Sequence, residues 1–158
     1  LCSKYVDKIV TVTDDEVSSA ILSMLEHQKL ITEGAGAVAV AAAMFDKVPV
    51  EGKKVVCVVS GGNIDVNILD RVIKRGLLTA GRSCALTIEL IDKPGQLLLI
   101  SKIIAENGGN VISVHHERAN ASMDINGCFL RVNMETRNFE QIENIKKALT
   151  DEGFHICQ

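Results

Sequence analysis

The chain has almost no aromatic side chains, which make up 3% of its 158 residues, and it has no tryptophan. Apolar residues nevertheless make up 47% of the sequence. We therefore expect a core built from the aliphatic side chains of Val, Ile, Leu and Ala. The length suits one ordinary domain or two small ones.

An excess of basic residues is also missing. The formal net charge is −3 and no cluster of Lys and Arg stands out, which argues against a nucleic-acid-binding surface. The longest uncharged apolar stretch, residues 35–45, is too short to cross a bilayer, and no signal peptide is visible. We expect neither nucleic acid nor a membrane among the partners.

Cysteine pairs of the Cys-x-x-Cys kind are absent. The five cysteines are widely spaced: Cys2, Cys57, Cys84, Cys128 and Cys157. Three of them lie in apolar runs, where cysteine usually behaves as a small buried hydrophobe. This pattern indicates free thiols in a reducing compartment, the cytoplasm.

Histidines supply the one cluster that suggests a metal ion, His115-His116-Glu117. On a strand, however, neighbouring side chains point to opposite faces of the sheet. His115 and His116 therefore cannot share one ion there, and the sequence predicts no metal site.

The most informative feature that is present is the run Val55–Val59, which stops at Ser60-Gly61-Gly62-Asn63. This pattern predicts a buried strand, a tight turn and then a helix over residues 64–78. In α/β proteins, ligands bind where such strands end. The alternative is an ordinary strand-to-helix turn with a satisfied serine.

Other patterns complete the first half of the chain. Residues 5–12 predict a short strand, and Thr13 with Glu16 predicts a capping box at the start of a helix that continues to about residue 29. A second helix opens at residues 33–37 and continues through residues 38–43, which are small on every face. Such a helix is expected to be buried on all sides.

After a linker at residues 79–83 the pattern changes. Six elements follow in the order β-α-β-β-α-β, over residues 84–91, 96–106, 111–118, 128–135, 139–151 and 153–157. Asp92-Lys93-Pro94-Gly95 predicts a turn, and residues 124–127 predict a hairpin turn. The order is that of an α+β ferredoxin-like domain, an antiparallel sheet of four strands with two helices on one face.

This second half, residues 81–158, resembles the ACT domain, a module that binds amino acids. The features that match are Asp92-Lys93-Pro94-Gly95-Gln96-Leu97 and Asn107-Gly108-Gly109-Asn110-Val111. The resemblance implies an effector site built from Asp92, Pro94, Gly95, Gln96, Leu97, Asn110, Val111 and Ile112, formed where two such domains pair in a homo-oligomer. The alternative is that these are ordinary turns and caps.

The first half, residues 1–80, resembles the C-terminal part of the α/β catalytic domain, of fold type II, in pyridoxal-phosphate-dependent threonine dehydratases. Residues 32–37 and Ser60-Gly61-Gly62-Asn63-Ile64-Asp65 carry this match. The resemblance implies β-elimination from L-threonine to 2-oxobutanoate and ammonia, with isoleucine or valine as the branched-chain effector in isoleucine biosynthesis. A serine dehydratase or racemase-type enzyme, or a free-standing ACT-type sensor, remains the alternative.

The resemblance also implies the cofactor-binding residues: Ser60 at the pyridine nitrogen of pyridoxal phosphate, with Gly61, Gly62, Asn63 and Glu33 around it. Glu33 and Asp65 could instead simply cap the helices that follow them. The family's Schiff-base lysine and phosphate-binding loop match no residues in this chain, which begins at Leu1 rather than Met. We therefore expect a piece of a longer enzyme that holds no catalytic residue and is inactive alone.

Overall fold

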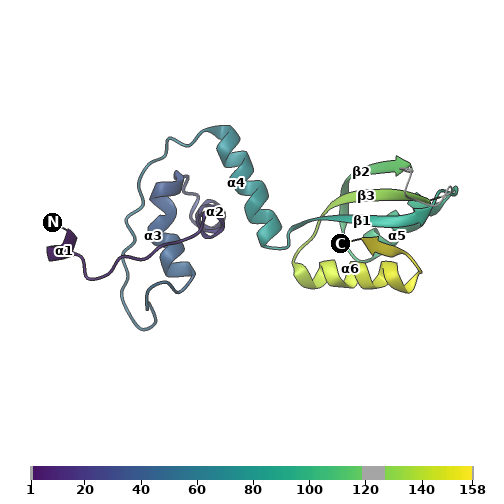
Figure 1. The fold of residues 1–158 in the computed structure, drawn as a ribbon. Helices are drawn as coiled ribbons and strands as arrows, with labels where there is room; N and C mark the ends of the chain where they lie inside the picture. The colour runs from purple at the N-terminus through teal and green to yellow at the C-terminus, as the bar shows by residue number, and fades with distance from the viewer. Residues whose placement is uncertain (1, 119–126, 158) are drawn as a thin grey trace. The chain divides into compact units, whose positions relative to one another are not determined.

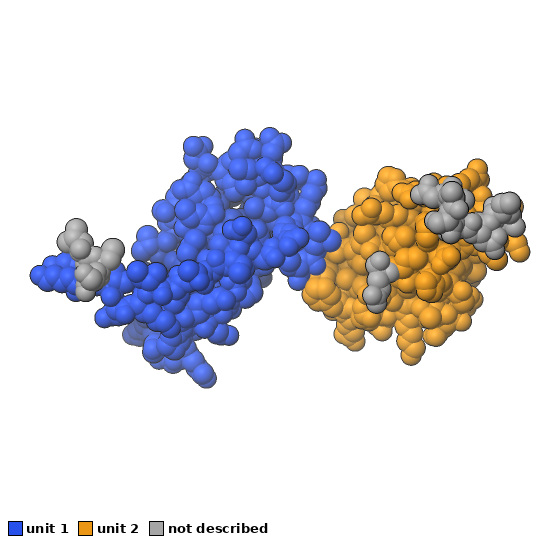
Figure 2. All heavy atoms as spheres, viewed as in Figure 1, with its two compact units in different colours: residues 1–79 blue, residues 80–158 orange. Residues whose placement is uncertain are grey.

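The computed structural model describes residues 2–118 and 127–157, with only the backbone of residues 2 and 3. They form two compact units, unit 1 (Leu1–Thr79) and unit 2 (Ala80–Gln158) (Figure 2). Among the described residues, none of the helices has the length and apolar character that crossing a membrane requires.

Unit 1 consists of helices joined by extended segments. The helices are α1 (Cys2–Tyr5), α2 (Asp14–Ser23), the π-helix η1 (Met24–Gln28), α3 (Gly34–Met44) and α4 (Val66–Thr79) (Figure 1). The capping box predicted for α2 is confirmed, since Thr13 Oγ1 accepts from the Glu16 amide and Glu16 Oε2 accepts from the Thr13 amide. Lys29, with φ 58°, ends the helical stretch in the left-handed conformation.

The core of unit 1 lies where α2 packs against α3. Ala20, Ile21 and Met24 meet Ala37 and Ala41, whose small side chains permit a close approach of the two helices. The opposite side of α3 is open, since Ala39 is exposed, and 40% of the neighbouring Val38 is exposed as well. The expectation that α3 is buried on all sides is therefore wrong, because α2 covers only one face of it.

Both strands expected in unit 1 are also wrong. Residues 6–12 and Val55–Val59 have no regular structure, and Val56 and Val58 are 90% and 77% exposed. A strand is stabilised by hydrogen bonds to a neighbouring strand, and the described part of unit 1 contains none. The β-branched residues of Val55–Val59 favour a strand, but the described part of unit 1 has no other strand with which they could pair.

Unit 2 contains the six elements that the sequence predicts after the linker. Their order, β-α-β-β-α-β, is confirmed. They are β1 (Ser83–Ile91), α5 (Gln96–Glu106), β2 (Asn110–Arg118), β3 (Gly127–Glu135), α6 (Phe139–Asp151) and β4 (His155–Cys157) (Figure 1). The predicted hairpin turn at residues 124–127 lies outside the described residues except for Gly127.

The four strands form one antiparallel sheet in the order β2-β3-β1-β4. Alternate residues of β1 and β3, among them Ile88 and Leu130, face the core, where they meet Ile104 of α5 and Ile145 of α6. Both helices therefore cover the same face of the sheet. The intervening residues, such as Glu89, stand on the other face.

Candidate functional site

In unit 1 the structure joins the two motifs singled out in the sequence. The Thr32 hydroxyl donates to the Ser60 carbonyl at 2.8 Å, and the Glu33 amide donates to the Gly61 carbonyl at 2.7 Å. Thr32 is completely buried. The turn that presents Ser60 is therefore anchored through its backbone, which leaves the side chains of the turn available for other contacts.

Two glycines make this close approach possible. A Cβ at Gly36 would overlap the Ser60 carbonyl oxygen and the Thr32 hydroxyl, and a Cβ at Gly61 would overlap the Glu33 side chain. Gly61 also has φ +72°, a conformation that other residues rarely adopt. The turn depends on glycine at both positions.

The predicted cofactor-binding residues surround this turn. Ser60, Gly61, Gly62 and Asn63 are all exposed, and Glu33 is half-buried. Glycine lets the backbone approach a ligand closely, because it has no side chain. These exposed positions beside a close backbone contact are compatible with a bound cofactor.

The two helix-capping alternatives have different outcomes. Asp65 caps α4, since its Oδ1 accepts from the Asn67 amide at 2.8 Å. Glu33 occupies the N-cap position of α3, but its side chain makes no capping hydrogen bond and lies against Gly61 instead. The Glu33 carboxylate therefore does not cap α3.

In unit 2 the predicted turn after β1 leads into α5. Gly95, with φ +92°, is the residue that turns the chain into the helix. Asp92 Oδ2 lies 2.9 Å from Arg118 Nε, and Asp92 Oδ1 lies 3.8 Å from His116 Nε2. The Asp92 carboxylate thus faces basic groups of β2.

A hollow of about 850 Å³ opens beside this turn. Asp92, Lys93 and Gln96 line one side, and Glu152 and His155 line the other. Sequence reasoning missed the second side, the connection between α6 and β4. The available signal in the sequence was the glycine at position 153, which has φ +87° in the turn that returns to the sheet.

The remaining predicted effector residues lie at the other end of the sheet. Asn110 is opposite Glu135, which is opposite Ser83 at the start of β1, whereas Asp92 follows the end of β1. Asn110 Nδ2 donates to Glu135 Oε2 at 2.8 Å. One chain therefore does not bring Asn110, Val111 and Ile112 together with the turn at residues 92–97.

Comparisons with known proteins found similarity in part of unit 1 and along most of the chain. Residues 1–61 match the family model "Pyridoxal-phosphate dependent enzyme". The chain is 42% identical over 156 residues to the L-threonine ammonia-lyase of Thermotoga maritima, covering 99% of this chain and 39% of that protein.

Further relatives carry related names. The L-threonine ammonia-lyase of Geobacter sulfurreducens is 41% identical over 151 residues, covering 96% of this chain and 38% of that protein. The biosynthetic L-threonine dehydratase IlvA of Halalkalibacterium halodurans is 33% identical over 97 residues, covering 61% of this chain and 23% of that protein. The chain spans well under half the length of these relatives.

Proposed function

We propose that this chain acts as part of an enzyme that converts L-threonine to 2-oxobutanoate and ammonia. The chain is similar to an L-threonine ammonia-lyase along 99% of its length. Its residues 1–61 match the pyridoxal-phosphate dependent enzymes. The identity of 42% to a threonine ammonia-lyase over 156 residues carries this proposal. The family match implies pyridoxal phosphate as the cofactor. The free thiols of Cys57, Cys84, Cys128 and Cys157 are compatible with a cytoplasmic enzyme.

In this proposal the Ser60 turn holds the cofactor ring. Pyridoxal phosphate, when bound, supplies an electron sink for reactions at the α-carbon of an amino acid. The Ser60 hydroxyl would donate a hydrogen bond to the pyridine nitrogen. A hydroxyl carries no charge near neutral pH, so it does not hold a proton on that nitrogen as a carboxylate would. Gly61, Gly62 and Asn63 would let the backbone approach the ring, and Glu33 would orient it.

We expect the protein encoded by the complete reading frame that contains this chain to form 2-oxobutanoate from L-threonine. We expect the 158-residue chain alone to form none. Ser60→Ala in the complete protein should lower kcat/KM by about 2- to 10-fold, the effect of losing one hydrogen bond of ~0.5–1.5 kcal/mol. Ser101→Ala, in α5, serves as the control that leaves kcat/KM unchanged.

The same assay tests the competing substrates. L-serine is compared with L-threonine, and racemisation of L-serine is followed by the appearance of the D-enantiomer. Turnover of neither amino acid by the complete protein would overturn the proposal. An unchanged kcat/KM and an unchanged cofactor absorption spectrum for Ser60→Ala would show that Ser60 does not bind the cofactor. That outcome would not contradict the proposed activity.

We further propose that unit 2 is a ferredoxin-like ACT domain, residues 81–158, behind a piece of the catalytic domain, residues 1–80. The order β-α-β-β-α-β and the strand order β2-β3-β1-β4 support this proposal. A regulatory domain of this kind acts by binding an effector unequally in two conformations of the enzyme.

The hollow beside the β1–α5 turn is the proposed effector site. Lys93 offers a positive charge to the carboxylate of an amino acid, and Glu152 offers negative charge to its ammonium group. Asp92, which is paired with Arg118, lines the same hollow. The N-terminus of α5 also favours an anion nearby. These charges suit a zwitterion, and Leu99 adds an apolar wall for a branched side chain.

Pairing of two copies would bring in the remaining predicted residues. β2 is an edge strand, and edge strands pair readily with another chain. Ile112 lies at the irregularity between Val111 and Ser113 and is 59% exposed, so it offers apolar surface at that edge. We propose a homo-oligomer in which Asn110, Val111 and Ile112 of a second copy complete the effector site.

We expect isothermal titration calorimetry of this chain to show saturable binding of isoleucine or valine, and weaker binding of serine and threonine. Lys93→Met should weaken that binding by about 10-fold or more, the effect of losing a charged hydrogen bond of ~1.5–3 kcal/mol. Lys102→Met, at an exposed ion pair with Glu106 on α5, is the matched control. Sedimentation with and without effector measures the oligomer. Absence of binding heat for all four amino acids would contradict the effector site.

A further inference from the structure

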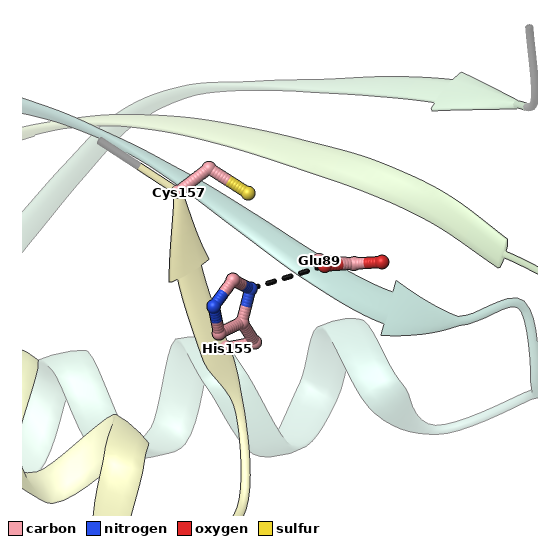
Figure 3. Close-up of side chains that lie close together, drawn as sticks. All are labelled: Glu89, His155 and Cys157. Carbon is pink, nitrogen blue, oxygen red and sulfur yellow. Dashed lines mark hydrogen bonds and ion pairs between the residues drawn. The ribbon is translucent and has the colours of Figure 1, made fainter. Parts of the chain in front are cut away.

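Three side chains with metal-binding groups meet on the face of the sheet that the helices do not cover. Glu89 lies on β1, and His155 and Cys157 lie on the edge strand β4 (Figure 3). Ile88 and Ile156, which alternate with them, pack against the core on the opposite face. The strand register places Glu89 opposite His155 and Thr87 opposite Cys157.

The three groups are close enough to share one ion. His155 Nδ1 lies 3.0 Å from Glu89 Oε2, and one ligand atom from each of the three residues lies within 4.8 Å of the other two. Ligand atoms around a tetrahedral zinc ion are about 3.3–3.8 Å apart, as bond lengths of about 2.0–2.3 Å require. Glu89 and His155 are exposed and Cys157 is half-buried, so their side chains have room to rotate toward this geometry.

We propose that Glu89, His155 and Cys157 bind one divalent ion of the zinc type. A thiolate, an imidazole and a carboxylate are the ligand types that zinc prefers. The thiol gives up its proton to solvent when the ion binds, and the imidazole binds in its neutral form. Three protein ligands leave the fourth position for a water molecule, which the exposure of the site permits.

The contact already present does not oppose metal binding. The side chains of His155 and Glu89 are 74% and 48% exposed, and an exposed ion pair contributes little to stability. Replacing it by two bonds to an ion therefore costs little. The ion would link β4, a strand of three residues, to the centre of the sheet. It would also form part of the wall of the hollow, since Glu89 and His155 line it.

A second cluster with the same kinds of ligand group is less suitable. Asp92, His116 and Cys128 also lie within 4.8 Å of one another. Cys128 is completely buried, and burial, together with the nearby Asp92 carboxylate, raises the pKa of its thiol. The Arg118 guanidinium already pairs with Asp92. This positive charge and the protonated thiol both disfavour a cation.

The test uses the full chain, freed of metal and kept reduced. Zn²⁺ is titrated by calorimetry, and Co²⁺ is titrated by absorption, because a thiolate bound to cobalt produces a charge-transfer band in the near ultraviolet. We expect one ion per chain and this band. Cys157→Ser should abolish the band, and Glu89→Gln and His155→Ala should each weaken Zn²⁺ binding at least ~10-fold, since even outer-shell partners of a metal contribute that much.

His116→Ala, in the second cluster, is the matched control and should change neither stoichiometry nor affinity. All these side chains are exposed except Cys157, which is half-buried, and circular dichroism checks that each variant is folded. Absence of binding by the wild-type chain would overturn the proposal. A cobalt band that survives in Cys157→Ser, or that disappears in His116→Ala, would overturn it as well.

Discussion

Replacing Gly36 with alanine will separate the two motifs that form the candidate site of unit 1. The new Cβ would overlap the Ser60 carbonyl oxygen and the Thr32 hydroxyl, and would lie 2.8 Å from the Ser60 carbonyl carbon. Neither neighbour can move aside easily, because one is backbone and the other is completely buried. Overpacking of this kind costs about 1–3 kcal/mol, and the Thr32–Ser60 hydrogen bond would be lost with it.

Hydrogen exchange and urea unfolding of the 158-residue chain measure this effect. We expect faster exchange at the Glu33 amide, which donates to the Gly61 carbonyl, in Gly36→Ala. Threonine turnover by the complete protein should be at least ~10-fold lower, because the Ser60 hydroxyl is no longer held in place. Gly34→Ala is the matched control, since a Cβ at Gly34 meets only Val17 Cγ1 at 3.8 Å. Equal exchange and equal stability in the two variants would show that the turn is not anchored there.

Replacing Ile104 with alanine will destabilise unit 2 by about 2–5 kcal/mol, the usual cost of a cavity in a well-packed core. Ile104, on α5, is completely buried against the sheet and α6. Gly109 approaches it closely, because a Cβ at Gly109 would lie 2.8 Å from Ile104 Cγ2. Such a loss is a large part of the ~5–15 kcal/mol that stabilises a typical domain. The proposed effector hollow should be lost wherever the variant unfolds.

Thermal unfolding followed by circular dichroism tests this prediction against Leu98→Ala. Leu98 lies on the same helix but is 75% exposed, so its replacement should change the free energy of unfolding by less than ~0.5 kcal/mol. A midpoint for Ile104→Ala that matches the midpoint of Leu98→Ala would mean that α5 does not cover the sheet as described.

Unit 2 could be predicted from the sequence because its signals are local. Asn138 caps α6, accepting from the Gln141 amide at 2.9 Å, and Gly108 and Gly153 adopt the positive φ that ends a helix. The alternation of apolar and polar residues in β3 matches its pattern of burial. Each of these signals depends only on residues a few positions away.

Unit 1 was harder to predict because a strand is not a local structure. Val55–Val59 has the composition of a buried strand, but the fate of such a run depends on whether another strand lies beside it. The described part of unit 1 supplies helices instead. The residues that follow have no regular structure either, but the glycine at position 61 was a usable signal, because it adopts a positive φ that favours glycine in any surroundings.

The sequence by itself determined α2 with its capping box, α3, α4, the six elements of unit 2, and the two motifs that resemble a pyridoxal-phosphate enzyme. Only the tertiary structure decided that Thr32 holds the Ser60 turn, that Asn110 lies far from Asp92, and that Glu89 meets His155 from 66 positions away. The physical reason is that helix and strand periodicity relate residues only to near neighbours in the chain. Which distant residues meet is set by strand order and register, which no single segment encodes.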